Sequence, residues 1–386
     1  MLDNKIKIAQ FGLYFPHYRE DLFKILSKND DYLFHFYGDQ NFKGGFNLLK
    51  PCNSTYNLIQ SKVIKIKIIK KKIFIIPSAF FSLLKGNYDI YILSNRITEF
   101  PALLTPLFTT VLKRKIILWG HGKINRNSTT EYVLRKMLIK SATACLFYND
   151  NEKNFWINNG IKKEKLFVAK NTVNTETILK IKNDIRNEEL ERFAVENNLV
   201  NKKILIFSAR LLKEKNPLFI IEIILKLKYK IPNILALIIG DGPLMNELES
   251  KIKERSLESN VRLLGQIYDE IILAKYFLNS HAYIIPSAAG LSLLHAFCYG
   301  LPVITDNDMQ KHGPEIEALV NGENGFVCEK NDIEDFIEKI HLVLTDEDLR
   351  KKLSKNAIKT ILQEYNINNM VKGFYHMFSQ ININSY

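Results

Sequence analysis

The sequence predicts an α/β protein built from two doubly wound parallel-sheet domains. Three observations support this class: the length of the chain, the alternation of short apolar runs with helical segments, and a second start of that alternation after the polar stretch 171–201. A chain of 386 residues is too long for one core and suits two domains of roughly 150 to 200 residues each. Short buried strands that alternate with helices form a parallel sheet with helices on both faces.

The predicted strands form two series. The first comprises residues 6–11, 32–37, 63–68, 90–93, 115–119, 144–148 and 166–169, and the second 203–208, 234–239, 261–264, 282–285, 303–305 and 325–328. Helical patterns lie between the strands, for example at 218–229 and 244–254. This order favours a parallel sheet in each half of the chain.

We expect an N-terminal domain at 1–172, a C-terminal domain at 173–365, and a helical tail at 366–386 that packs back on the first domain. Residues 180–200 are predicted to be a helical insertion that opens the second domain. Ligands of open α/β sheets settle outside the carboxyl ends of the strands. The cleft between two such domains is therefore the expected active site.

The charge balance favours an anionic partner. The net charge is +13, and the segment Lys62–Lys72 holds six lysines in eleven residues without an acid. Its alternation of Lys and Ile predicts a strand with one cationic edge, which would either lie on anionic membrane headgroups or be a solvated edge strand guarded by lysines. Nucleic acid is not an expected partner, because the sequence has no aromatic platform or recognised motif for it.

Neither an export signal nor a membrane-spanning segment is evident, and the four cysteines are scattered without a Cys-x-x-Cys pair. These features fit a cytoplasmic protein, with peripheral attachment to the inner face of the cytoplasmic membrane as a further option. No metal site is suggested.

The segment Ser208–Pro217, SARLLKEKNP, follows an apolar strand and precedes a helix that begins near Pro217. Arg210 and Lys215 thus leave the carboxyl end of a strand and flank a helix start, where cations and free backbone N–H groups favour phosphate. The alternative is that both side chains are simply solvated. No Walker or complete G-x-G-x-x-G motif is present, which argues against ATPases and ordinary dinucleotide enzymes.

A short helix is predicted between Gly290 and Gly300, with Pro302 preventing its continuation. Ser292, His295 and Tyr299 share one face of it, and apolar residues cover the rest. This stripe either faces an enclosed polar space or contains a core histidine satisfied by a backbone carbonyl.

Two polar segments end strands of the first domain. His121 lies between two glycines at the end of the strand 115–119, where an exposed imidazole suits catalysis or recognition. Gly12, His17, Tyr18 and Arg19 follow the first strand and offer aromatic and cationic groups on the same edge. Alternatively, Tyr18 packs inside and Arg19 caps a helix.

Taken together, these motifs resemble the retaining GT-B-fold glycosyltransferases of family 4. The resemblance covers Leu205 to about Leu344 through S-A-R-x-x-x-x-K-N-P, G-D-G-P, V-R-L-L-G and P-S-x-x-G-L-x-x-x-H-A-x-x-Y-G-x-P-V-I-T, in that order. N-terminal similarity is thinner: G-H-G after a strand, and A-K-N-T near the domain junction.

The resemblance implies roles for individual residues. Arg210 and Lys215 would bind the diphosphate of a nucleotide-sugar, and His121 would be the catalytic residue near the transferred sugar. No metal or other cofactor is implied. The remaining donor-side residues are Gly290, Leu291 and Ser292 at the helix start and Gly265, Gln266 and Ile267 against the base; Gly12, His17, Tyr18 and Arg19 would lie on the acceptor side.

This sequence departs from the family at two positions. The family usually has two glutamates eight residues apart around the short helix, and here Ser287 and His295 take their places. A neutral imidazole could accept the hydrogen bonds of the donor ribose in place of the second glutamate. Glu315 could supply a carboxylate instead of the first, or could be an ordinary acid at a helix start.

The resemblance therefore implies a hexosyltransferase-type enzyme (EC 2.4) that moves a sugar, most simply from UDP, to a glycan or lipid-linked saccharide in bacterial surface polysaccharide synthesis. A second hypothesis is a non-catalytic homologue that binds membrane or a partner protein, supported by the two missing glutamates. A nucleotide-sugar 2-epimerase has less support, because no suitable set of carboxylates is evident.

Overall fold

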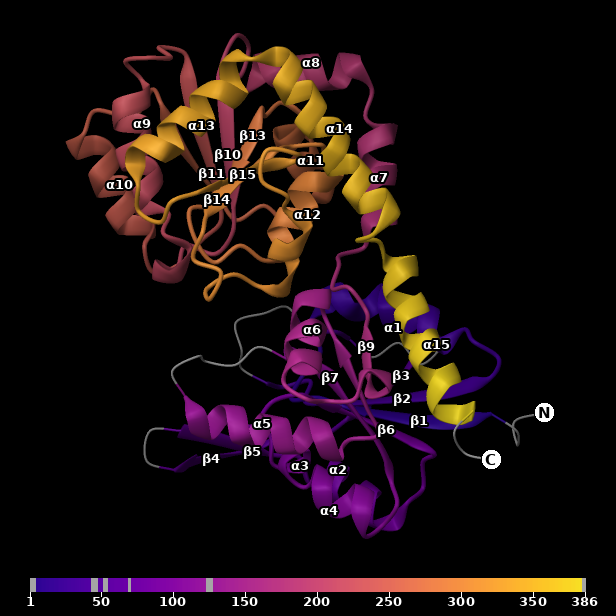
Figure 1. The fold of residues 1–386 in the computed structure, drawn as a ribbon. Coiled ribbons are helices and arrows are strands. Elements are labelled where there is room, and N and C mark those ends of the chain that lie inside the picture. The colour runs from indigo at the N-terminus through magenta and orange to yellow at the C-terminus, as the bar shows by residue number, and fades with distance from the viewer. Residues whose placement is uncertain (1–4, 43–47, 51–54, 69–70, 123–127, 384–386) are drawn as a thin grey trace. The chain divides into compact units, whose positions relative to one another are not determined.

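The structure is a computed structural model that describes residues 5–42, 48–50, 55–68, 71–122 and 128–383. The chain divides into two compact units, each drawn in Figure 1. Unit 1 comprises Met1–Asn171 and Ile367–Tyr386, and unit 2 comprises Thr172–Asn366.

Unit 1 contains a seven-stranded sheet in the order β3-β2-β1-β6-β7-β8-β9, and every pair in it is parallel. Its strands are β1 (Ile6–Phe11), β2 (Tyr32–Gly38), β3 (Asn57–Gln60), β6 (Ile90–Ser94), β7 (Lys115–Gly120), β8 (Ala144–Phe147) and β9 (Leu166–Val168). Its α-helices are α1 (Glu20–Ser27), α2 (Pro77–Lys85), α3 (Phe100–Leu103), α4 (Thr105–Thr110), α5 (Thr129–Ser141), α6 (Asp150–Asn158) and α15 (Ile367–Ile383).

Unit 2 contains a six-stranded parallel sheet in the order β12-β11-β10-β13-β14-β15. Its strands are β10 (Lys203–Ser208), β11 (Ile234–Ile239), β12 (Val261–Gly265), β13 (Ala282–Ile284), β14 (Val303–Asp306) and β15 (Gly325–Cys328). Its α-helices are α7 (Thr175–Asp184), α8 (Asn187–Glu196), α9 (Leu218–Leu227), α10 (Met245–Glu254), α11 (Glu270–Leu278), α12 (Leu291–Cys298), α13 (Ile333–Thr345) and α14 (Glu347–Gln363).

Two doubly wound parallel sheets confirm the predicted fold class. Strand β11, ILALII, is buried at every position, as expected of a strand whose two faces are both covered by helices. Helix α9 packs against β11, and α13 packs against β13 and β14. The core of unit 2 is accordingly formed by the apolar faces of the sheet and of these helices.

The strand prediction at 63–68 is wrong in one respect. Strand β4 (Ile64–Ile68) does not join the parallel sheet but pairs antiparallel with β5 (Lys71–Ile75), and Ile69 and Lys70 lie outside the described residues. The alternating lysines explain this, since a strand with both faces buried cannot accommodate them. The place beside β2 is taken by β3 instead.

Lysines of this hairpin remain accessible. Lys65, Lys67 and Lys72 are exposed, as is Lys62 just before the hairpin, and Ile64 and Ile66 are 43% and 40% exposed. The membrane-contact and edge-protection hypotheses both require exposed lysines, so the hairpin leaves both open.

Helix α15 packs on α1, β8 and β9 within unit 1. Ile367, Met370, Phe374, Met377 and Phe378 recur along it at a spacing of three or four residues and are buried. This spacing places them on one face of the helix. The C-terminal helix therefore completes the core of unit 1.

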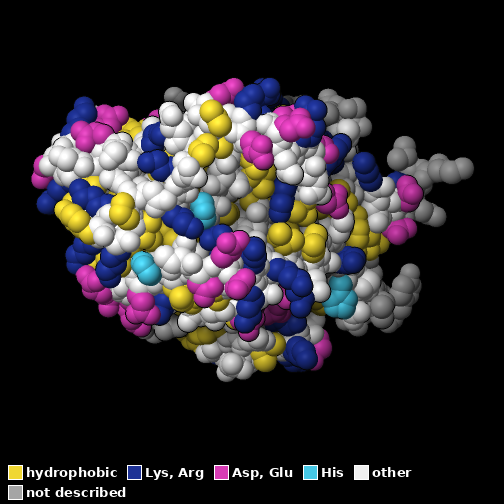
Figure 2. Space-filling view, turned by 90° about the horizontal axis from the view of Figure 1, so that it is seen from above, with side chains coloured by type: hydrophobic (Ala, Val, Ile, Leu, Met, Phe, Trp, Pro, Cys, Tyr) yellow, Lys and Arg dark blue, Asp and Glu magenta, His cyan; other side chains and the backbone are white. Residues whose placement is uncertain are grey.

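Charged side chains of both signs are interspersed on the face of the molecule drawn in Figure 2. Among the described residues, no helix has the length and apolarity needed to cross a membrane. Cys145, Cys298 and Cys328 are buried free thiols, and Cys52 lies outside the described residues.

Candidate functional site

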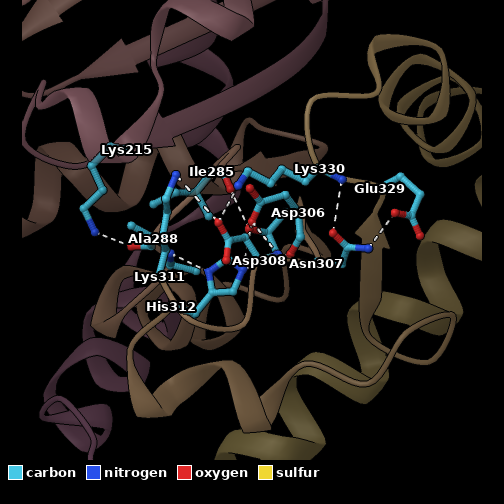
Figure 3. A network of polar contacts seen from close by, with 12 residues as sticks. Lys215, Ile285, Ala288, Asp306, Asn307, Asp308, Lys311, His312, Glu329 and Lys330 are labelled. Atoms are coloured by element: carbon cyan, nitrogen blue, oxygen red, sulfur yellow. Dashed lines mark hydrogen bonds and ion pairs between the residues drawn. The ribbon is translucent and has the colours of Figure 1, made fainter. Parts of the chain in front are cut away.

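The order of strands in unit 2 reverses between β10 and β13, which lie side by side at the centre of the sheet. Ligands of doubly wound sheets bind at such a switch point, beyond the carboxyl ends of the strands. Two chain segments leave the sheet there, 209–217 after β10 and 285–290 after β13. A hydrogen bond joins them, because Lys215 Nζ donates to the carbonyl oxygen of Ala288 (Figure 3).

The first segment carries the two predicted phosphate ligands. Arg210 is exposed just beyond β10, and Lys215 ends a 3₁₀ turn (η3, Lys213–Lys215). Asn216 then adopts a left-handed conformation, and Pro217 is the N-cap residue of α9. Burial lowers the pKa of Lys215, while the nearby carboxylates of Glu214 and Glu315 oppose that shift. The segment thus places two cationic side chains at the switch point.

A histidine that the sequence reasoning missed holds the second segment. The backbone N–H of Ala289 donates to His312 Nδ1 at 2.9 Å, so the ring proton lies on Nε2. That nitrogen is 2.9 Å from both the carbonyl oxygen and Oδ1 of Asp306, at the end of β14 (Figure 3). The imidazole is fully buried. It therefore fixes the position of the 285–290 segment, including Ala288, which has a left-handed φ of 52°.

His312→Phe should weaken binding of the nucleotide that the sequence resemblance implies, UDP, by roughly tenfold, because the Ala289 N–H loses its acceptor and the segment loosens. His312→Gln should recover part of the affinity, since an amide can both accept and donate. The control is His281→Phe: His281 Nδ1 accepts from Ile204 N–H at 3.2 Å at the other end of the sheet. Calorimetric titration measures the affinity of each variant. Equal losses of affinity for His281→Phe and His312→Phe would contradict a positioning role for His312.

Ser287 and Glu315 are both 3% exposed; Ser287 lies between β13 and α12, and Glu315 lies in a 3₁₀ helix (η4, Pro314–Ala318) that follows β14. Ser287 Oγ has no hydrogen-bond partner among the described residues. Glu315 Oε2 is 3.8 Å from the position that a Cβ on Gly290 would occupy. Gly290 is the N-cap residue of α12, which starts at Leu291. Polar groups therefore surround the N-terminus of this helix.

A carboxylate, that of Glu270, makes hydrogen bonds with two residues of the polar stripe on α12. His295 Nε2 is 2.6 Å from Glu270 Oε1, and the Tyr299 hydroxyl donates to the same oxygen at 2.8 Å. Ser292, on the same face, bonds to the hydroxyl of Tyr283. The backbone-carbonyl alternative for His295 is therefore wrong. Sequence reasoning missed Glu270, because an acid at the start of a helix is ordinarily explained by the helix dipole.

Burial alone would raise the pKa of Glu270, but hydrogen bonds from His295 and Tyr299 outweigh it and lower the pKa below the ordinary 4.5. The ionised carboxylate therefore stabilises the fold above that pH, and this contribution is lost as the pH falls through the lowered value. Glu270→Gln should be less stable than the wild type at pH 6, and the difference should shrink towards pH 3. Urea midpoints across this range measure it, and a constant difference would contradict the assignment.

The loop after β12 carries the residues expected against a base. The N–H of Gly240 donates to the carbonyl oxygen of Gly265 at 2.8 Å, and Gln266 Nε2 donates to Asp241 Oδ2 at 3.1 Å. The Tyr268 hydroxyl donates to Gln266 Oε1. Gly265, Gln266 and the neighbouring Ile267 are thus connected to the G-D-G-P turn on the same edge of the sheet.

In unit 1, His121 lies at the carboxyl end of β7, and its side chain is 49% exposed. Its Nδ1 is 4.0 Å from Glu152 Oε1, and its ring meets the Tyr148 ring edge to face at 4.9 Å. Arg135 donates to the His121 carbonyl oxygen at 3.1 Å, which anchors the backbone. An accessible imidazole beside a carboxylate is suited to proton transfer or to polar recognition.

Arg19 is 6% exposed and is held within unit 1. Its guanidinium donates to Asn171 Oδ1 at 2.6 Å and lies over the rings of Tyr18, Trp119 and Tyr148. It occupies the N-cap position of α1, but its side chain makes no capping bond. Arg19 therefore organises the aromatic groups around it. Gly12 and Tyr18 line the same region, and His17 is exposed.

Residues 189–360 match the family model described as "Glycosyl transferases group 1". The chain is 25% identical over 247 residues to the capsular polysaccharide biosynthesis glycosyltransferase CapM of Staphylococcus aureus, covering 61% of this chain and 60% of the relative. It is 32% identical over 177 residues to the UDP-Gal:alpha-D-GlcNAc-diphosphoundecaprenol alpha-1,3-galactosyltransferase of Escherichia coli, covering 43% of each. These two matches thus span less than two thirds of the relatives' lengths.

Solved structures resemble the whole chain. A glycosyltransferase from Rickettsia africae ESF-5 has a TM-score of 0.76 at 19% identity, covering 99% of this chain and 100% of the other. Anabaena HepE in complex with UDP has a TM-score of 0.73 at 14% identity, covering 97% and 99%. The fold is therefore GT-B, as predicted. The match to the family model is confined to residues 189–360, and over the rest of the chain the solved structures show the same fold.

Proposed function

We propose that the chain is a retaining glycosyltransferase, related to family 4, that transfers a sugar from a nucleotide-diphospho-sugar, with UDP as the nucleotide. The observation that carries this proposal is the hydrogen bond between Lys215 and Ala288, which joins two loops at the switch point of unit 2. Arg210 and the N-terminus of α12 border the same point. Two cationic groups and free backbone N–H groups favour a diphosphate.

In this mechanism the bond between the anomeric carbon and the diphosphate oxygen breaks, and the acceptor oxygen bonds to the same face of the sugar. The departing oxygen takes the proton of the acceptor hydroxyl. Arg210, Lys215 and the N-terminus of α12 stabilise the negative charge that develops on the diphosphate. We propose that no metal is required, because these groups supply the positive charge.

The other site residues take supporting roles. We assign Gln266 and Ile267 to the base, and Glu315 with Ser287 to the hydroxyls of the transferred sugar. His295, held by Glu270, faces the ribose in this proposal, and His121 orients the reacting groups. Glu270 thus supplies a carboxylate near the position where the sequence lacks the usual glutamate.

The proposed acceptor is a saccharide, free or lipid-linked, in surface polysaccharide synthesis. The Escherichia coli relative is named for an acceptor attached to diphosphoundecaprenol. The exposed lysines of the β4–β5 hairpin would favour attachment to an anionic membrane surface. This arrangement would bring the enzyme to a lipid-linked substrate.

The experiment is incubation of the purified protein with UDP-, GDP- and ADP-sugars, with released nucleoside diphosphate as the readout. We expect slow donor hydrolysis with one UDP-sugar, unchanged by EDTA, and proton NMR should show that the first sugar formed keeps the donor's anomeric configuration. The inverted anomer would contradict a retaining mechanism. No release from any donor, even with membrane extract as a source of acceptors, would favour a non-catalytic, membrane- or partner-binding homologue.

A further inference from the structure

The backbone ladder between β10 and β13, the two strands at the switch point of unit 2, ends before β10 does. The last pair in their register is Ile206 with Tyr283, and β10 continues for two more residues, to Ser208. The carbonyl oxygen of Ser208 accepts a hydrogen bond from the Tyr283 hydroxyl at 2.9 Å. A side chain therefore connects the two strands beyond the point where their backbones stop pairing.

The same hydroxyl group also contacts helix α12. Ser292, the second residue of α12, makes a side-chain hydrogen bond to it. Because Tyr283 gives its single hydroxyl proton to Ser208, its oxygen accepts the proton of Ser292. One phenol oxygen thus links Ser208, which lies two residues before Arg210, with the first turn of the helix whose N-terminus borders the candidate site.

Packing fixes the ring that carries this hydroxyl. Tyr283 is fully buried in β13, whose other two residues, Ala282 and Ile284, are apolar and also fully buried. Phe277 of α11 stacks on the ring with 6.1 Å between the centroids. A phenylalanine would satisfy such surroundings, whereas a buried hydroxyl requires hydrogen bonds. What the hydroxyl adds to the packing is therefore the link between β10 and α12.

The other connection at this junction uses a group that the ligand would engage. Lys215 Nζ donates to the carbonyl oxygen of Ala288, and the same ammonium group would contact the diphosphate in the proposed function. Its N–H donors would then be divided between the ligand and Ala288, which weakens the connection between the two loops. The hydrogen bonds of Tyr283 are made by a fully buried, uncharged group, so a diphosphate does not compete for them.

We propose that Tyr283 is a positioning residue of the diphosphate site, and that it holds the segment carrying Arg210 against the start of α12 while Lys215 turns to the ligand. This inference rests on the proposed function. Groups that stabilise charge are most effective when they are held in place before the ligand arrives. Tyr283 contacts no ligand in this account and acts through Ser208 and Ser292.

The first test needs no nucleotide. Hydrogen exchange, measured by mass spectrometry, should be roughly fivefold faster for the backbone amides of 209–215 in Tyr283→Phe than in the wild type, because the segment opens more readily. Tyr276→Phe is the matched control: Tyr276 is 7% exposed in α11, and its hydroxyl donates to Asn197 Oδ1 at 3.1 Å. It loses a hydrogen bond of the same kind and should leave exchange at 209–215 unchanged. Unchanged exchange there in Tyr283→Phe would overturn the proposal.

The second test is calorimetric titration with UDP. Tyr283→Phe should weaken binding by roughly fivefold to tenfold, and Tyr276→Phe should leave it unchanged. In an Arg210→Ala background, Tyr283→Phe should weaken binding by no more than about twofold, because the group that it positions is gone. The same factor in both backgrounds would show a purely structural effect and overturn the proposal. A wild type that binds no UDP would contradict the proposed function, whereas the exchange test would still decide whether Tyr283 holds the segment.

Discussion

Arg210→Ala should lower kcat/KM for sugar transfer by roughly 100- to 1,000-fold, the loss typical when one group that stabilises developing charge is removed. Lys215→Ala should lower kcat/KM by at least as large a factor. Its ammonium group would contact the diphosphate and also donates to Ala288, so the variant loses a charge and loosens the junction between two loops. The measurement is initial rates of nucleoside diphosphate release.

Lys213→Ala is the matched control for both variants. Lys213 belongs to the same 3₁₀ turn as Lys215 but is exposed. Its removal changes the net charge equally, so kcat/KM should stay within about twofold of the wild type if contact with the diphosphate matters more than overall charge. Equal losses for Lys213→Ala and Arg210→Ala would show that long-range attraction explains the effect, and the site assignment would be wrong.

Gly240→Ala should destabilise unit 2 by about 3 kcal/mol or more, the largest stability effect that we expect from a single methyl group. Gly240 has a φ of 139°, and a Cβ there would lie 2.0 Å from the carbonyl oxygen of Ala209. Relief of that clash must move either the G-D-G-P turn or the segment that carries Arg210. Nucleotide binding should therefore fall together with stability.

Gly265→Ala provides the comparison. Gly265 also has a positive φ, 68°, but a Cβ there would meet no atom within 4 Å. Gly265→Ala should therefore lose only the stability that an alanine loses in the left-handed conformation, about 1–2 kcal/mol. Thermal unfolding of the two variants should differ clearly, with Gly240→Ala melting several degrees lower. Equal melting temperatures would contradict the close approach of the two loops.

The sequence predicts the sheets well because the signals are local. A run such as ILALII in β11 has one simple explanation, a strand buried on both faces. Strand β3 escaped prediction because, of its four residues, only Leu58 is buried. The hairpin β4–β5 was misplaced because its alternation indicates a half-exposed strand but does not say which sheet the strand joins.

In the candidate site too, local sequence signals predict some residues and miss others. Arg210 and Lys215 are predictable, since each follows a strand end and flanks a helix start. The bond between His295 and Glu270 joins residues 25 positions apart, and the bond between Ala289 and His312 joins residues 23 apart. No local pattern encodes such pairs, because they depend on which loops the topology brings together. The left-handed φ of Ala288 likewise has no sequence signal, since alanine is not a typical turn residue.

The nucleotide-sugar site in unit 2 is tested most directly by calorimetric titration of the protein with UDP, with GDP and ADP for comparison, repeated with Arg210→Ala. We expect UDP to bind at one site per chain, more tightly than GDP and ADP, and Arg210→Ala to weaken this binding by roughly tenfold or more. Absence of UDP binding, or binding that Arg210→Ala leaves unchanged, would contradict a nucleotide-sugar site at the junction of β10 and β13.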